Sequence, residues 1–125
     1  MSIAANKALA LRYFKLVEEG HIDDALALAS DDARFWHPAS GESTKEGLRA
    51  AYRQFAPLFK SFRTTVLSVT AEENRVAVEL EANIDLANGR HYHNRYLFLL
   101  AVHDAKIVSV SEYVDTKAFE AALAG

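Results

Sequence analysis

The chain has 125 residues, half of them hydrophobic, and a formal net charge of −3. This length predicts a single domain over residues 1–125, and the acidic balance gives no basic footprint for nucleic acid. The absence of cysteines excludes disulfides and thiolate metal sites. The sequence also shows neither a signal-peptide pattern nor an apolar run of about 20 residues. Together with the lack of cysteines, these features favour a cytoplasmic protein with no membrane contact.

The first half of the chain predicts three helices around one short strand. Gly20 is a natural stop for the first helix, Asp23 can cap the second, and Pro38 breaks the strand. Residues 43–46 have the spacing of a capping box, which opens the third helix, and Pro57 bends or ends it. The predicted elements are a helix over 3–19, a helix over 25–29, a strand over 33–37 and a helix that carries 48–58.

The second half predicts a meander of strands and a last helix. Apolar and acidic residues alternate along the strand over 75–86, as expected of a sheet with one solvent-exposed face. Asn88-Gly89, which follows this strand, is a strong turn signal. Asp115 or Thr116 can cap the last helix. The predicted elements are strands over 61–70 and 75–86, a hairpin over 94–116 and a helix over 117–123. Helices followed by strands favour the α+β class, with the helices packed on one face of a curved sheet.

The hairpin is predicted to turn at Asp104-Ala105, which sets its register. A two-residue loop places Leu97 opposite Glu112 and Arg95 one pair further along. One face then carries His93, Arg95, Leu97, Leu99, Ala101, Val108, Val110, Glu112 and Val114. The other face carries Asn94, Tyr96, Ser109, Ser111 and Tyr113 among others, which fits a dimer seam or a hydrated surface. A register slip of one residue would exchange the two faces.

A family resemblance rests mainly on this hairpin. Its residues are Asn94, Tyr96, Asp104, Lys106, Ile107, Glu112, Tyr113, Asp115 and Thr116. The pattern resembles the SnoaL-like and ketosteroid-isomerase-like branch of the nuclear transport factor 2-like superfamily. The resemblance implies a cone-shaped α+β barrel whose open end is a ligand pocket, and a homodimer formed through the sheet face. This family usually has Gly after the turn Asp, where this chain has Ala105.

Glu112 is the first candidate for chemistry. The resemblance implies that this strand position points into the pocket, and aliphatic neighbours would suit the carboxyl group to acid or base work. Arg95 would then orient Glu112 or tune its charge, although a purely structural ion pair explains the two residues equally well. Epoxide-hydrolase-like relatives also use an Arg and a second Asp on a neighbouring strand. Here that strand offers Glu79 and Glu81 and no Arg.

His37 and Tyr13 are the next candidates. His37 lies where the isomerases keep a general base, and an imidazole titrates near neutral pH. The alternative to this catalytic role is that His37 lies at the pocket rim and makes only a polar contact. Tyr13 lies where the isomerases place a donor to the developing oxyanion, but it also fits the apolar stripe of its helix. His91 and His93 alternate with Arg95 along one strand face, which makes a metal site conceivable. Two histidines spaced two residues apart are common by chance, so we assign no metal ligands.

Two hypotheses about function follow. In the first, the protein is an isomerase or cyclase that transfers a proton on a small hydrophobic carbonyl or polyketide-like ligand and needs no cofactor. In the second, the same fold is a non-catalytic module for ligand binding or dimerisation. Epoxide hydrolysis and metal-assisted chemistry are weaker alternatives. The expected ligand-binding residues are Trp36, Tyr52, Phe55, His93, Leu97, Leu99, Val110 and Val114, and the aromatic ones among them would serve equally well as core.

Overall fold

The computed structural model describes residues 2–124, which form four α-helices and six β-strands. None of the helices in this range is both long and apolar enough to cross a membrane. In chain order the elements are α1 (Ile3–Glu18), α2 (Ile22–Ala27), β1 (Ala29–His37), β2 (Gly41–Ser43), α3 (Lys45–Phe55), the 3₁₀ turn η1 (Ala56–Leu58), β3 (Phe59–Glu72), β4 (Arg75–Leu86), β5 (His91–His103), β6 (Lys106–Tyr113) and α4 (Thr116–Ala124).

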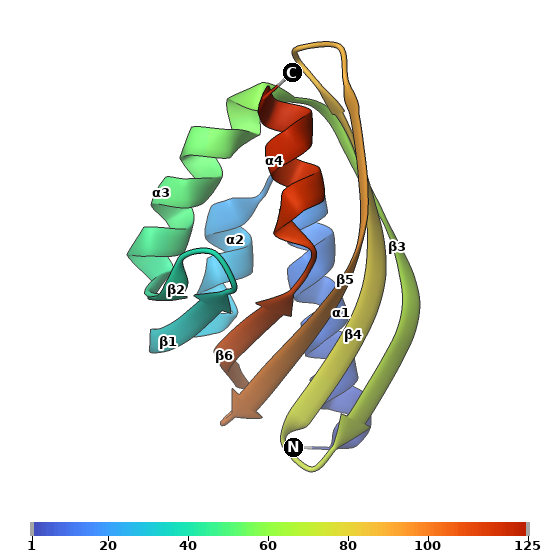
Figure 1. The fold of residues 1–125 in the computed structure, drawn as a ribbon. Coiled ribbons are helices and arrows are strands. Elements are labelled where there is room, and N and C mark those ends of the chain that lie inside the picture. The colour runs from blue at the N-terminus through green and yellow to red at the C-terminus, as the bar shows by residue number, and fades with distance from the viewer. Residues whose placement is uncertain (1, 125) are drawn as a thin grey trace.

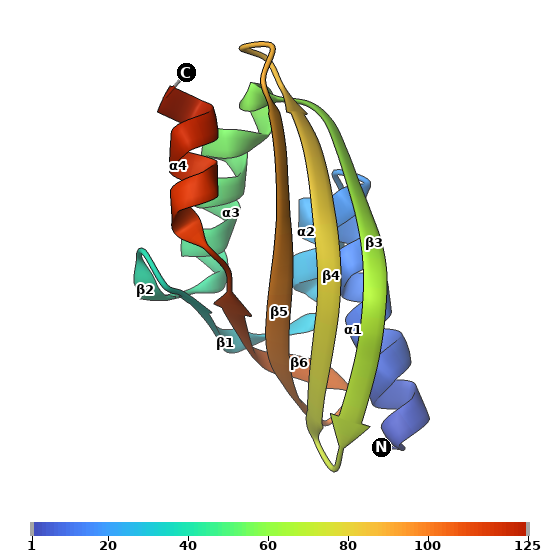
Figure 2. The ribbon, with the colours of Figure 1, turned by 45° about the vertical axis from the view of Figure 1, so that its right-hand side comes forward.

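The strands form one curved sheet in the order β2-β1-β6-β5-β4-β3. Strands β1 and β6 are parallel, and the other neighbours are antiparallel. Figure 1 shows the helices gathered on the concave side of the sheet, and Figure 2 shows β3, β4 and β5 bending around them. Neither view shows a described helix on the convex side. This arrangement confirms the predicted α+β fold.

Strand β4 shows what fixes the orientation of the sheet. Its alternate residues from 76 to 86 are buried, whereas Glu79 and Glu81 between them form ion pairs on the convex side. Val76 and Leu80 belong to the same core cluster as Tyr13 of α1. Fully burying a side chain of this size contributes about 1.5–3 kcal/mol, so the apolar face of β4 turns toward the helices. The alternation predicted for this strand is therefore confirmed.

The turn between β5 and β6 lies at Asp104-Ala105, as predicted, with His103 paired to Lys106. Both turn residues have positive φ, 49° for Asp104 and 62° for Ala105. This backbone is that of a type I′ turn, which favours glycine because a Cβ atom is strained there. The turn thus keeps this conformation although Ala105 stands where the family usually has glycine.

Beyond the turn, the register differs from the prediction because β6 contains a bulge. The pairing shifts by one residue between Ala101 and Val102 of β5, which leaves Val108 of β6 without a partner. In a regular strand Ile107 and Val110 would face opposite sides of the sheet. Both are nevertheless buried, at 0% and 5% exposure, because the extra residue turns both side chains toward the core.

The bulge decides which face carries Glu112. This residue lies opposite Phe98 rather than opposite the predicted Leu97. Side chains that lie directly opposite one another share a face of the sheet, so Glu112 points to the concave side. Arg95 stays on the convex side, where it contacts acidic residues of β4. The predicted register and the predicted Arg95–Glu112 pair are therefore wrong.

Several element boundaries also differ from the predictions. Strand β1 begins at Ala29, and α2 has no side-chain cap, so Asp23 does not cap it. The hydroxyl of Thr44, rather than a box that starts at residue 43, accepts a backbone N–H at the start of α3. At α4, Oδ1 of Asp115 accepts the N–H of Lys117 at 2.9 Å, which confirms one of the two predicted caps.

Candidate functional site

A cavity of about 650 Å³ lies between the concave face of the sheet and the helices. Twelve of the thirteen aromatic residues of the chain line it, and the remaining one is Tyr113. The volume is in the range of small-molecule sites, which aromatic side chains typically line. The cavity therefore suits an apolar ligand. The twelve residues are Tyr13, Phe14, Phe35, Trp36, Tyr52, Phe55, Phe59, Phe62, Tyr92, Tyr96, Phe98 and Phe119.

Glu112 and His37 meet in this cavity because β1 and β6 are parallel neighbours. Trp36 pairs with Ser111 in the ladder, so the residues that follow them lie side by side at the ends of the two strands. The Nε2 atom of His37 lies 3.3 Å from Oε2 of Glu112. Both residues were predicted from the sequence on separate grounds, and the tertiary structure brings them into contact.

Both ring nitrogens of His37 are engaged. Nδ1 accepts the N–H of Ala39 at 3.1 Å, so the neutral ring carries its proton on Nε2, which faces Glu112. The hydrogen bond to Glu112 raises the pKa of His37, although partial burial of the ring opposes the rise. Within residues 2–124, Oε1 of Glu112 has no hydrogen-bond partner. This oxygen is the one that stays available to a ligand.

Tyr13 of α1 contributes a phenol group to the same cavity. Its side chain is only 4% exposed, and its hydroxyl forms no hydrogen bond within residues 2–124. Burial raises the pKa of Tyr13, and the negative charge of Glu112 raises it further. The phenol therefore keeps its proton and can donate a hydrogen bond to a ligand oxygen.

A second polar group of the site comes from β5 and escaped the sequence analysis. The hydroxyl oxygens of Tyr92 and Tyr96 lie 2.6 Å apart, and Nδ2 of Asn94 donates to the Tyr92 hydroxyl at 2.9 Å. Both tyrosines line the cavity, so the prediction that Tyr96 lies on an outer face of the sheet is wrong. The alternation Tyr-x-Asn-x-Tyr was a usable signal, since three polar residues at period two share one face of a strand.

Four predicted site residues of β5 lie outside the cavity, on the convex face that pairs them with the acidic face of β4: Arg95, His93, Leu97 and Leu99. Arg95 pairs with Glu81 at 3.2 Å and with Glu79 at 3.8 Å. Nε2 of His93 lies 3.3 Å from Oε2 of Glu81. Arg95 therefore cannot orient Glu112 through a direct contact.

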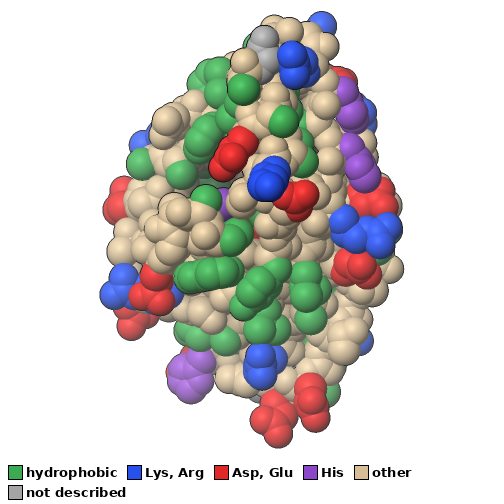
Figure 3. Space-filling model, viewed as in Figure 1, with side chains coloured by type: hydrophobic (Ala, Val, Ile, Leu, Met, Phe, Trp, Pro, Cys, Tyr) green, Lys and Arg blue, Asp and Glu red, His purple; other side chains and the backbone are tan. Residues whose placement is uncertain are grey.

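The convex face also holds His91, which contacts Asp85 at 2.7 Å. Figure 3 shows histidine, acidic and basic side chains along the right-hand edge of the molecule, and a group of hydrophobic side chains lower down over β5 and β6. His91 and His93 thus lie on the opposite side of the sheet from His37. The metal site considered for this histidine pair would need His37 and Glu112 on the same face, and the structure places these two residues on the other face.

The residues around the cavity include acids but neither Lys nor Arg. Glu112 lies inside, whereas the other lining carboxylates, those of Glu42, Asp115 and Glu120, belong to exposed residues. Without a lining Arg, the cavity lacks the acid and Arg combination of the epoxide-hydrolase-like relatives.

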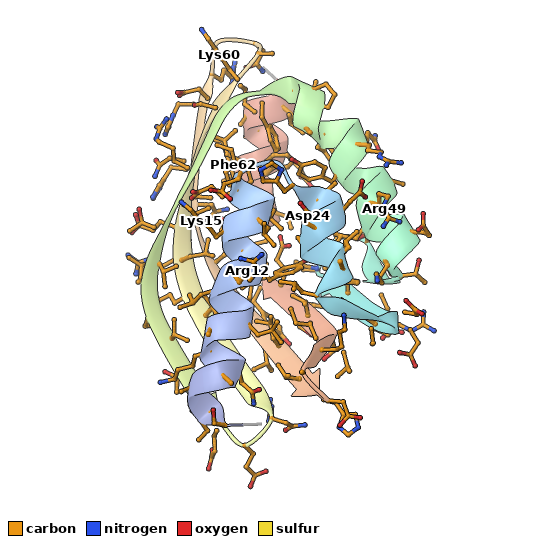
Figure 4. The ribbon with its side chains drawn as sticks, turned by 180° about the vertical axis from the view of Figure 1, so that it is seen from behind. Arg12, Lys15, Asp24, Arg49, Lys60 and Phe62 are labelled. Atoms are coloured by element: carbon orange, nitrogen blue, oxygen red, sulfur yellow. The ribbon has the colours of Figure 1, made fainter. Side chains whose placement is uncertain are left out.

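Basic residues of the helices lie elsewhere on the molecule. Figure 4 shows Arg12 and Lys15 on the side of α1 turned to the viewer, and Arg49 on the outer side of α3. Arg49 is neutralised on the surface by Asp23, at 2.8 Å, and by Glu46. The absence of basic residues from the cavity lining is therefore a property of its position in the fold, since the chain as a whole has 14 Lys and Arg residues.

The cavity brings together eight of the twelve predicted site residues: Tyr13, Trp36, His37, Tyr52, Phe55, Val110, Glu112 and Val114. The members that the sequence analysis missed include Tyr92, Tyr96, Phe98 and Phe119. Phe98 was assigned to the opposite hairpin face from Glu112. Phe119 lies in the predicted last helix, where nothing in the sequence indicated that it packs against Phe55 and Tyr92.

Solved structures of similar fold exist at low sequence identity. AclR from Streptomyces galilaeus, provisionally described as a hydroxylase, has 18% identity and a TM-score of 0.87, with 98% of this chain and 87% of that chain covered. A provisionally named polyketide cyclase from Xanthomonas campestris pv. campestris has 18% identity and a TM-score of 0.83, with 97% and 98% covered. An NTF2-like protein from Burkholderia xenovorans LB400 has 23% identity and a TM-score of 0.76, with 98% of both chains covered.

These identities establish a common fold and leave the activity open. No curated protein matches the chain. A family profile, described as the SnoaL-like domain, matches residues 10–110, which include the second half of α1, every element from α2 to β5 and the first part of the bulged strand β6. The chain shares its fold with the NTF2-like protein. With most of its length matched by the profile, the chain belongs to the SnoaL-like domain family.

Proposed function

We propose that this protein is an enzyme that transfers a proton at the carbon next to the carbonyl group of a small, uncharged, hydrophobic molecule. The observation that carries the proposal is the contact of Glu112 with His37 inside a cavity with aromatic walls. A carboxylate in such surroundings can act as a general base. The provisional name of the Xanthomonas campestris relative, polyketide cyclase, supports a polyketide-like carbonyl compound as the ligand class.

In the proposed step, Oε1 of Glu112 takes a proton from the α-carbon of the ligand. The C–H bond breaks, its electron pair forms the enolate, and the negative charge develops on the carbonyl oxygen. Glu112 then returns the proton to the same carbon or to a conjugated one, which regenerates the carboxylate. Isomerisation and aldol-type ring closure both begin with this enolate.

His37 acts through Glu112 in this scheme. Its Nε2–H fixes one carboxylate oxygen, and the N–H of Ala39 fixes the other side of the ring. The imidazole is thus a positioning group that leaves Oε1 of Glu112 free for the ligand. Tyr13 donates to the ligand oxygen, because its phenol keeps its proton beside the carboxylate.

The absence of basic side chains from the lining supports an uncharged ligand. An anionic group in the cavity would have no Lys or Arg partner there and would lie near the carboxylate of Glu112. Aromatic walls offer a flat, apolar surface to a ring system instead. An aromatic ketone is therefore a suitable probe.

The test is deuterium exchange at the methyl group of 2-acetonaphthone, an uncharged aromatic ketone, followed by NMR in heavy water. Glu112→Gln should slow the enzyme-dependent exchange at least about 100-fold, as expected for loss of a general base. The matched control is Glu79→Gln, the same change at an acid that pairs with Arg95 on the convex face.

The result separates an enzyme from a binding module. If neither the probe nor a panel of enolisable ketones exchanges faster with the wild-type protein than with buffer, the proposal is wrong. Should these ketones nevertheless bind, the non-catalytic ligand-binding module becomes the function to pursue.

A further inference from the structure

The hydrogen-bond donors that can meet a negative charge in the cavity are few. No Lys or Arg lines it, and the Nε2 proton of His37 is directed at Glu112. Charge that develops on a ligand oxygen must therefore be stabilised by donors other than Lys and Arg, and hydroxyl groups are among them. Besides Tyr13, the cavity presents the hydrogen-bonded pair of Tyr92 and Tyr96.

The side chain of Asn94 sets the direction of hydrogen bonding in this group. Its Oδ1 accepts the N–H of Arg95 at 2.9 Å, and its Nδ2 donates to the carbonyl oxygen of Asp115 at 2.8 Å. Exchanging the two amide atoms would place an oxygen against a carbonyl, so the orientation is unambiguous. The second proton of Nδ2 is then donated to the hydroxyl oxygen of Tyr92, at 2.9 Å.

The two tyrosines differ in how far they are enclosed. Tyr92 is 2% exposed, packs against Phe119 and already accepts from Asn94. Tyr96 is less buried and lies stacked on Phe98, another residue of the cavity wall. With Tyr92 donating to Tyr96, the hydroxyl of Tyr92 both accepts one hydrogen bond and donates one. The proton of Tyr96 is then the one left for the cavity.

We infer that Tyr96 donates a hydrogen bond to the ligand oxygen on which negative charge develops, and that Asn94 and Tyr92 polarise this donor through a chain of hydrogen bonds. The inference rests on the proposed function and adds to it a second donor and the groups that position it. Successive hydrogen bonds strengthen one another, so the terminal hydroxyl of the chain is a better donor than an isolated phenol. Tyr96 keeps its own proton throughout, while the proton of the ligand moves to Glu112.

The electrostatics of the cavity suit this role. Burial and the charge of Glu112 raise the pKa of Tyr96. The hydroxyl is thus a donor in the resting state. When Glu112 takes the proton of the ligand, its negative charge disappears and a new one arises on the ligand oxygen. The hydrogen bond from Tyr96 is then stronger in the transition state than in the ground state, which is the condition for catalysis.

The first test uses the variants Tyr96→Phe and Tyr92→Phe in the exchange assay with 2-acetonaphthone. Tyr96→Phe should slow the saturated rate about 100-fold while changing the affinity for the ketone much less, as for loss of one oxyanion donor. Tyr92→Phe keeps the terminal hydroxyl and should cost less, about threefold to tenfold. Tyr113→Phe is the matched control, since this tyrosine does not line the cavity, and thermal melting checks that each variant folds.

The second test does not depend on turnover. In Glu112→Gln the acid is replaced by a neutral group of the same shape, which imitates its protonated form. This variant should bind 4-nitrophenolate, an analogue of the enolate, and the absorption band of the phenolate should shift on binding. Adding Tyr96→Phe should weaken binding at least about tenfold and remove most of the shift, because a hydrogen bond to a charged group is lost.

The outcomes distinguish the inference from the proposed function. If the Tyr96 hydroxyl changes neither phenolate binding nor its spectrum, the inference is overturned, whether or not the wild-type protein exchanges ketone protons. If phenolate binding depends on Tyr96 but no ketone exchanges, the proposed function fails and the assignment of the donor stands. A larger effect from Tyr92→Phe than from Tyr96→Phe would reverse the order of the chain and overturn the assignment of Tyr96.

Discussion

The charge character of the cavity leads to a sharp prediction about ligand selection. The probes are 2-acetonaphthone and 2-naphthoate, which have nearly the same shape and differ in whether the carbonyl carries a methyl group or an anionic oxygen. Since no Lys or Arg lines the cavity and Glu112 does, we expect the ketone to bind and the carboxylate to be rejected. The comparison isolates charge, because the aromatic contacts of the two ligands are the same.

The magnitude follows from Coulomb's law. Two carboxylates about 6 Å apart at an effective dielectric constant of about 20 repel one another by about 2.8 kcal/mol, which is roughly a 100-fold difference in affinity. Removing the ligand carboxylate from water adds to this difference. The Glu112→Gln variant deletes the repulsion and leaves the desolvation, so it should narrow the preference for the ketone by about 100-fold.

Isothermal titration of both ligands against the wild-type protein and against Glu112→Gln measures this effect. Glu79→Gln serves as the control, because it removes the same charge from the convex face. The reasoning is refuted if the naphthoate binds the wild-type protein as well as the ketone does. It is also refuted if the preference for the ketone is the same in Glu112→Gln as in the wild-type protein.

Three further predictions concern pH, the turn and the convex face. Because Glu112 raises the pKa of His37, protonated His37 stabilises the fold below the unfolded value of 6.5, and this contribution is lost as pH rises through the folded pKa. Thermal melting should therefore show a larger deficit for His37→Asn at pH ~5.5 than at pH ~8.5, and an equal deficit would contradict the pairing. Ala105→Gly should stabilise the protein by about 0.5–1 kcal/mol in urea unfolding, since it relieves a positive φ of 62°, and a lower stability would show that the turn is unstrained. Leu97 and Tyr113 are paired on the convex face and are 45% and 47% exposed, so we propose that this face forms a homodimer. Leu97→Asp should convert the dimer to a monomer in light scattering after size exclusion, and a monomeric wild-type protein would disprove the interface.

Much of the fold could be predicted from the sequence because local rules decide it. The alternation of apolar and acidic residues in β4 predicts which face is buried, and the two apolar runs around Asp104-Ala105 predict the position of the turn. The helices follow from their spacing and their stops. These features depend on residues close together in the chain, so the local sequence is sufficient to predict them.

The faces of the last hairpin could not be predicted in the same way. The requirement that Ile107 and Val110 both enter one core is met by a bulge at Val108, and this requirement arises only when the helices cover the sheet. One extra residue in β6 moves Glu112 to the face that lines the cavity, whereas Arg95 of β5 stays on the convex face. The chemistry of the site therefore depends on a feature with no sequence signal of its own.

The composition of the sequence determined what the protein can contain, namely one core, many aromatic side chains and a few ionisable groups at strand ends. Tertiary structure decided which of these groups meet. The parallel pairing of β1 with β6 brings His37 to Glu112, and the curvature of the sheet around the helices gathers twelve aromatic residues about one cavity. Contacts between residues distant in the chain depend on how the layers pack, and no local pattern encodes that packing.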